Sequence, residues 1–85
     1  MYAYGLGVAQ DDAQAVALFR KAADQGIADA QYSLGVMYKD GRGVAQDDVQ
    51  AVAWFRKAAD QGFAPAQEAL RKMEASGRGI PKQPR

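Results

Sequence analysis

The stretch Gly41–Gly62, G-R-G-V-A-Q-D-D-V-Q-A-V-A-W-F-R-K-A-A-D-Q-G, decides the fold because it is the second copy of a pattern. Gly5–Gly26 reads G-L-G-V-A-Q-D-D-A-Q-A-V-A-L-F-R-K-A-A-D-Q-G and lies 36 residues earlier. When each copy is extended to 24 positions, 20 of them are identical. A third start, G-R-G-I, begins at Gly77, again after 36 residues. A fixed period of this length indicates a repeat array.

The repeating unit is predicted to be a pair of helices. Asp11 and Asp47 are interpreted as N-caps, each with a Gln three residues later in the position of a capping-box partner. The helices that follow are expected to end near residues 25 and 61, and the alternate helices to cover 28–39 and 65–76. Short connections make neighbouring helices antiparallel. The sequence therefore predicts an all-α fold, an α/α right-handed superhelix (solenoid) of antiparallel helical hairpins.

The connections and the chain start follow from the same alignment. Glycine pairs at 5–8 and 41–44 are expected to form tight loops, because glycine accepts left-handed backbone at a helix end. Residues 1–4 align with 37–40 and are expected to be the last turn of a helix whose beginning is missing. We therefore expect the chain to be a piece of a longer array.

Apolar residues recur at helical spacing and predict the buried face of each helix. In the first copy they are Ala15, Leu18, Phe19, Ala22 and Ala23, and in the alternate helix Ala30, Leu34, Met37 and Tyr38. Gly35 interrupts the alternate helix, where glycine costs about 1 kcal/mol relative to alanine. We interpret it as a point where a neighbouring helix comes close.

Composition excludes several classes of function. The 85 residues carry 11 Lys and Arg against 10 Asp and Glu, a net charge of +1, which gives no general reason to bind nucleic acid. There is no His and no Cys, so zinc sites of the usual kinds and Cys- or His-based catalysis are excluded. No apolar run reaches the roughly 18–20 residues of a membrane span, so no membrane insertion is expected.

The remaining polar motifs are interpreted as structural. The Asp pairs at 11–12 and 47–48 lack the alternating oxygens and closing Glu of a Ca²⁺ loop, and they fit helix capping. The motif Gly41-x-Gly43 lacks the other elements of a phosphate-binding loop. The basic end, residues 71–85, has five basic residues against one acidic residue and no interleaved aromatic residues, so it is interpreted as a solvated surface. No acid–base constellation emerges, and we predict neither enzyme activity nor a cofactor.

The second copy resembles the Sel1-like repeat, a relative of the tetratricopeptide repeat. The residues that carry the resemblance are Ala30, Leu34, Gly35, Tyr38, Gly41, Gly43, Val44, Asp47, Ala51, Trp54, Phe55, Ala58, Ala59 and Gly62. It implies about two and a half repeats in a domain of residues 1–76, with boundaries near 26/27 and 62/63. Residues 77–85 would be a loop or tail, or the start of a truncated further repeat. Leu18, Arg71 and Glu74 depart from the pattern, and the charged residues fit a terminal cap.

The resemblance implies a non-enzymatic scaffold that binds a protein or peptide on its concave face. The binding residues expected there are Asp29, Tyr32, Val36, Lys39, Glu68 and Lys72. An exposed Tyr beside an apolar residue suits such a surface, because Tyr is enriched in interface hot spots. The competing interpretation is a solvated face on which Tyr32 packs against the neighbouring repeat.

Three further interpretations stay open from the sequence. The chain could be an architectural spacer in a longer array, or an envelope-associated binder of glycan or another small ligand in a pocket lined by Tyr32 and Trp54. A homo-oligomer through the uncovered repeat ends, Met1–Tyr4 with Phe19 at the front, is the third. Cytoplasm, periplasm and secretion are all compatible with the sequence.

Overall fold

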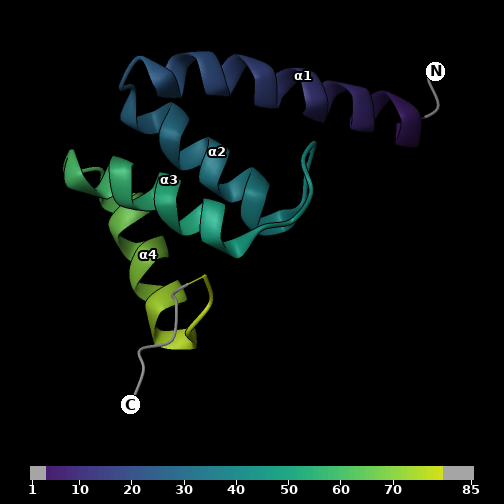
Figure 1. Cartoon of the computed structure of the whole chain (residues 1–85). Coiled ribbons are helices and arrows are strands. Elements are labelled where there is room, and N and C mark those ends of the chain that lie inside the picture. Colours follow the sequence, from purple (N-terminus) through teal and green to yellow (C-terminus); the bar gives the residue numbers. More distant parts are fainter. Residues whose placement is uncertain (1–3, 80–85) are drawn as a thin grey trace.

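Four helices follow one another in the computed structural model, which describes residues 4–79 and, for side chains, residues 12–79. They are α1 (Tyr4–Asp24), α2 (Ala28–Asp40), α3 (Asp48–Asp60) and α4 (Ala64–Ser76) (Figure 1). Each helix packs on the next along the chain, α1 on α2, α2 on α3 and α3 on α4. No strand occurs within 4–79. The predicted all-α solenoid of stacked hairpins is confirmed.

Helix ends in the second copy form as the residues predict. The Asp47 carboxylate accepts a hydrogen bond from the Gln50 N–H at 3.1 Å and caps α3. The Asp47 N–H donates instead to the Tyr38 carbonyl at 2.9 Å, so the reciprocal half of the capping box is replaced by a bond to α2. Gly41 ends α2 in left-handed backbone with φ of 70°. The 41–47 loop is therefore attached to α2 at both of its ends.

The first copy differs from the second, because α1 is a continuous helix through the predicted loop at 5–8. Asp11 consequently lies inside a helix and is not an N-cap, so both expectations are wrong. The loop at 41–47 is held by carbonyls of α2, which accept from Arg42 N–H and Asp47 N–H at 2.9 Å each. Among the described residues no separate helix lies before residues 5–8, and α1 runs through them. The expected helical turn at 1–4 lies outside the described residues except for Tyr4.

Two core clusters lie on either side of α2. The first gathers buried side chains of α1, α2 and α3, namely Val16, Ala23, Ala30, Leu34, Met37 and Trp54. The second joins α3 to α4 through Ala51, Val52, Phe55 and Met73, with Tyr32, Val36 and Leu70 packed against it. Both clusters are continuous with α2, so the core runs along the stack.

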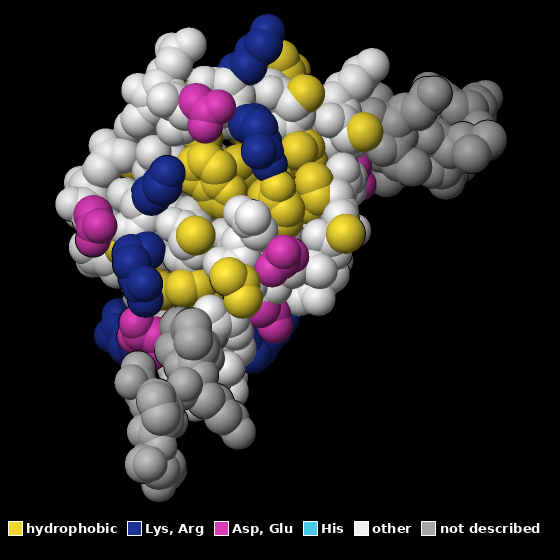
Figure 2. All heavy atoms as spheres, in the orientation of Figure 1, with side chains coloured by type: hydrophobic (Ala, Val, Ile, Leu, Met, Phe, Trp, Pro, Cys, Tyr) yellow, Lys and Arg dark blue, Asp and Glu magenta, His cyan; other side chains and the backbone are white. Residues whose placement is uncertain are grey.

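One predicted core residue, Leu18, is 66% exposed, whereas Val16, which the sequence analysis did not select, is buried. The equivalent residue in the second copy, Trp54, is only 8% exposed because it joins the cluster formed with α1 and α2. No described element covers Leu18 in the same way. Hydrophobic side chains also gather in the middle of the face seen in Figure 2, bordered by Lys and Arg side chains, so apolar surface remains open to solvent there.

Gly35 lies at a close approach of α3 to α2, as predicted. A Cβ added at this glycine would meet two carbons of the Phe55 ring at 2.7 Å and the Ala51 carbonyl oxygen at 3.2 Å. These distances are too short for a side chain to be accommodated without moving the helices apart. The missing side chain is therefore what allows Phe55 to be completely buried.

Candidate partner-binding groove

A groove of about 370 Å³ lies between α2 and α4, the first helices of the two hairpins. Its lining consists of Tyr32, Lys39, Pro65, Glu68, Ala69, Lys72, Met73, Ser76 and Arg78. Four of the six residues expected to bind a partner, Tyr32, Lys39, Glu68 and Lys72, thus meet around one hollow. The other two do not line it: Asp29 is exposed on the first turn of α2, and Val36 packs against the second core cluster.

Tyr32 serves two purposes in this arrangement. Its ring packs against Phe55 and Phe63, with 5.6 Å between ring centroids in each pair. The contacts fix the ring orientation, as the competing interpretation of this residue anticipated. The side chain nevertheless remains half-buried and forms part of the groove wall. Tyr32 is therefore a rigid aromatic surface, which costs little conformational entropy to use in binding.

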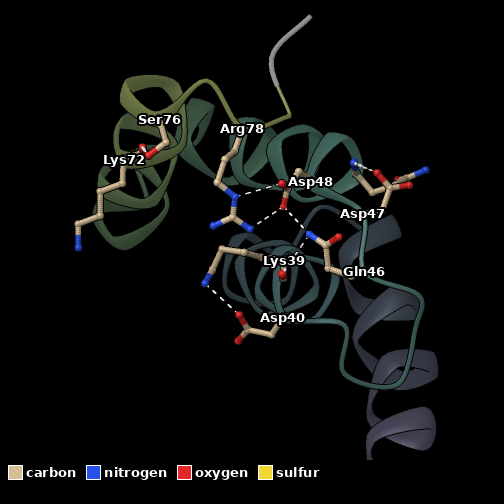
Figure 3. Close-up of polar contacts among 9 residues, drawn as sticks. Lys39, Asp40, Gln46, Asp47, Asp48, Lys72, Ser76 and Arg78 are labelled. Atoms are coloured by element: carbon tan, nitrogen blue, oxygen red, sulfur yellow. Dashed lines mark hydrogen bonds and ion pairs between the residues drawn. The ribbon is translucent and has the colours of Figure 1, made fainter.

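One end of the groove is cationic. Lys39 from α2, Lys72 from α4 and Arg78 from the following turn border the same hollow (Figure 3). Lys39 pairs with its neighbour Asp40 at 3.0 Å, while both side chains stay partly exposed to solvent. Exposed ion pairs of this kind contribute little and are readily exchanged. Lys72 makes no ion pair within the described part of the chain. This end can therefore accept an acidic group.

Arg78, which the sequence analysis did not select, is held in place by Asp48. Its Nε and one terminal nitrogen donate to the two carboxylate oxygens at 3.0 and 2.8 Å (Figure 3). This hydrogen bonding lowers the pKa of the Asp48 carboxyl, against an opposing effect of burial, and raises the pKa of Arg78. The two-point contact ties the turn after α4 to the start of α3. It thereby fixes one wall of the groove.

The same tether occurs one repeat earlier, where Arg42 donates to Asp12 at 3.0 Å. The second Asp of each pair is therefore a tether between consecutive repeats, and the assignment of both Asp pairs to capping is wrong for these two residues. A signal existed in the sequence, because Arg42 and Arg78 are separated by 36 residues, as are Asp12 and Asp48. That each Arg pairs with the Asp 30 residues earlier could be seen only from the way the helices stack.

Replacing Asp48 by Asn should make the difference in stability from the unmodified chain depend on pH. Because the folded-state pKa of Asp48 is lowered, its tether stabilises the fold above the unfolded-state value of about 4, and the contribution is lost as pH falls through the folded-state value. We expect Asp48→Asn to have a lower melting temperature than the unmodified chain at neutral pH. The difference between the two melting temperatures should disappear in acid. Thermal unfolding followed by circular dichroism measures this. Asp24→Asn, at an exposed Asp with no ion pair among the described residues, should show no such closing gap.

A small-ligand pocket built from Tyr32 and Trp54 does not form. Trp54 is buried among residues of the first core cluster, whereas Tyr32 packs against the second. Lys57 covers the Trp54 ring, with its ammonium 4.8 Å from the ring centroid. Tyr32 and Trp54 therefore do not share one surface on which a glycan could stack against both rings.

Among residues 12–79, whose side chains the structure describes, no cluster of three or more acidic groups suited to a metal ion occurs. None of the four helices within residues 4–79 combines the length and apolar character required to span a bilayer.

Comparison with known proteins places the chain among repeat proteins. The sequence pattern described as Sel1 repeat matches residues 1–27 and 28–63. The chain is similar to c5321, a protective antigen present in uropathogenic Escherichia coli strains and displaying an SLR fold, with 44% identity and a TM-score of 0.79. It is also similar to a Sel1 repeat protein from Oxalobacter formigenes, with 40% identity and a TM-score of 0.76. No curated protein matches it.

The alignments to these two structures cover 80% of this chain but only 15% of the first protein and 28% of the second. The chain thus spans less than a third of the length of either relative.

Proposed function

Because the chain belongs to the Sel1 repeat family, we propose that it is a non-enzymatic interaction module that binds a peptide segment of a partner protein in the groove between α2 and α4. The observation that carries this proposal is the convergence of Tyr32, Lys39, Glu68 and Lys72 on one hollow. We interpret this face, formed by the first helix of each hairpin, as the concave side of the solenoid.

The lining of the groove supports a peptide rather than a folded domain. Its volume of about 370 Å³ falls in the range of clefts that take a few side chains. Pro65, Ala69 and Met73 provide an apolar floor beside the Tyr32 ring, and the cationic end lies beyond them. A floor of this kind gains from burying an apolar side chain, while charged groups at the border fix orientation.

The charges at the groove favour an acidic residue in the bound segment. Among the lining residues three are basic, Lys39, Lys72 and Arg78, and one is acidic, Glu68. Arg78 already holds Asp48, so Lys72 is the cation with the greatest freedom to pair with a ligand. The proposed ligand is an extended segment with an apolar side chain followed by an acidic one.

Reversing the charge of Lys72 tests the proposal. We expect peptides selected from a displayed library on the unmodified chain to bind Lys72→Glu at least about tenfold more weakly, which corresponds to the loss of about 1.4 kcal/mol. The change leaves the fold intact, because Lys72 is exposed and faces the groove. Lys21→Glu, an equal charge reversal on exposed α1, should leave the affinity unchanged. NMR shift changes confined to α1 and α3, or equal affinities for both variants, would refute the groove as the binding site.

An architectural spacer is the second candidate, favoured by the repeated tethers Arg42–Asp12 and Arg78–Asp48. These tethers stiffen the connection between successive hairpins without requiring any ligand. The spacer function would be favoured if no displayed peptide bound the unmodified chain more tightly than it bound Lys72→Glu.

A further inference from the structure

The front face of the stack, formed by α1 and the turn that follows it, has the character of a helix-packing surface. Leu18 is 66% exposed and Ile27 is 48% exposed. The residues 36 positions later, Trp54 and Phe63, are buried and half-buried, and Phe63 packs against Tyr32 of α2. An α2-like helix is thus what covers this surface in the second copy. The corresponding helix at the other end of the stack is α4, so a second copy could in principle cover α1 with its α4.

The positions of α4 that face inward are equivalent to those of α2. Ala66 and Met73 are buried against α3, as Ala30 and Met37 are buried in α2. The positions by which α2 meets α3 differ, however, because charged residues replace small or apolar ones. Tyr32 corresponds to Glu68, Gly35 to Arg71 and Val36 to Lys72. Tyr32 and Val36 pack against the second core cluster, and Gly35 lies under the Phe55 ring. All three points of contact are therefore changed in α4.

The Arg71 position is the most restrictive of the three. If α1 of a second copy packed on α4 as α3 packs on α2, Arg71 would occupy the place of Gly35 and Phe19 the place of Phe55. Even a single Cβ at Gly35 would lie 2.7 Å from the ring. A full Arg side chain would hold the helices apart or bury its guanidinium without a partner, which is strongly unfavourable.

We propose that α4 closes the stack to a second copy of this chain: Glu68, Arg71 and Lys72 prevent α1 of another copy from packing on α4 as α3 packs on α2. The chain therefore stays monomeric although the Leu18 face of α1 is uncovered. Glu68 and Lys72 also line the groove, whereas Arg71 does not. The inference does not depend on peptide binding in the groove, because its readout is molecular mass. It argues against the homo-oligomer that the uncovered repeat ends suggest.

Replacing these three α4 residues by the residues at the equivalent positions of α2 should allow α1 of a second copy to pack on α4. We expect the unmodified chain to sediment as a monomer at all concentrations tested, and the triple variant Glu68→Tyr, Arg71→Gly, Lys72→Val to form dimers and longer species as concentration rises. Adding Leu18→Glu to the triple variant should restore the monomer, because the opposing face of α1 then carries a charge. Circular dichroism confirms that each variant is folded.

A matched control separates specific helix stacking from nonspecific hydrophobic association. The triple variant with Arg71→Ala in place of Arg71→Gly has nearly the same apolar surface, but its Cβ would meet the Phe19 ring, so it should associate far more weakly. If the triple variant loses helicity, the single variants Arg71→Gly and Arg71→Ala give the same comparison. The proposal is overturned if the unmodified chain associates and Leu18→Glu reverses this, if the folded glycine variant stays monomeric, or if the alanine form associates equally.

Discussion

Replacing Phe55 by Ala is expected to destabilise the chain by about 3–5 kcal/mol, the usual cost of emptying a buried aromatic site. That loss is a large fraction of the stability of a typical domain, about 5–15 kcal/mol, so the variant should unfold at a much lower temperature and urea concentration than the unmodified chain. The ring is completely buried and forms the centre of the second core cluster, between α2 and α4. Since Gly35 lies directly against it, α2 has no side chain there that could move into the cavity.

Urea unfolding followed by circular dichroism measures the effect of Phe55→Ala. The control is Leu18→Ala on α1, at a side chain that is 66% exposed, for which we expect a change within about 0.5 kcal/mol. Similar losses for the two variants would contradict the assignment of the core to the α2–α3–α4 contact.

Replacing Gly43 by Ala is expected to cost about 2–5 kcal/mol, from two separate causes. The backbone at Gly43 is left-handed with φ of 73°, which costs a residue with a Cβ roughly 1–2 kcal/mol. The added Cβ would also lie 2.5 Å from the Asp12 carbonyl oxygen and 2.9 Å from a methyl group of Val16. Because the first of these neighbours is helix backbone, the loop itself has to move, and overpacking adds about 1–3 kcal/mol.

Gly62→Ala is the matched control for Gly43→Ala. Gly62 is also left-handed, with φ of 85°, but nothing lies within 4 Å of its Cβ position. We expect this variant to lose only the backbone contribution, roughly 1–2 kcal/mol. The difference between the two variants measures the close approach of the loop to α1. Equal losses would mean that the 41–47 loop does not pack tightly on the preceding repeat.

The same contact recurs at Gly79, whose Cβ would meet the Asp48 carbonyl and a methyl group of Val52. Each glycine is preceded by the Arg that tethers to the same Asp, Arg42 to Asp12 and Arg78 to Asp48. The second glycine of each G-R-G motif thus allows the loop to pack against the helix of the preceding repeat, and the Arg between the two glycines forms an ion pair with that helix. The sequence revealed the repetition of the motif but not its partner, because the two lie 30 residues apart and meet only through stacking.

Several elements could be predicted because their causes are local. The Asp47 cap and the glycines at helix ends each act within one helical turn, and α2, α3 and α4 begin and end within one residue or so of their expected positions. Where the cause was not local, the prediction was wrong. The loop at 5–8 has the sequence of the loop at 41–44, yet it is helical, because the hydrogen bonds that hold the second loop come from α2.

The candidate groove shows the same division. Tyr32, Lys39, Glu68 and Lys72 were selected from the sequence as one face of the first helices, and they do line one hollow. Arg78 was not selected from the sequence, and Val36 packs against the second core cluster instead of lining the groove, because helix crossing determines which residues remain at its border.

By itself the sequence determined the repeat length, the kinds of element in each unit and the close approach at Gly35, since these depend on residues near one another or on a copied pattern. Only the tertiary structure decided which carbonyls hold each loop, which Arg fastens to which Asp, and that Leu18 is left uncovered while Trp54 is buried. The physical reason is that a repeat buries its apolar face only against its neighbours, so identical residues reach different states according to what lies beside them.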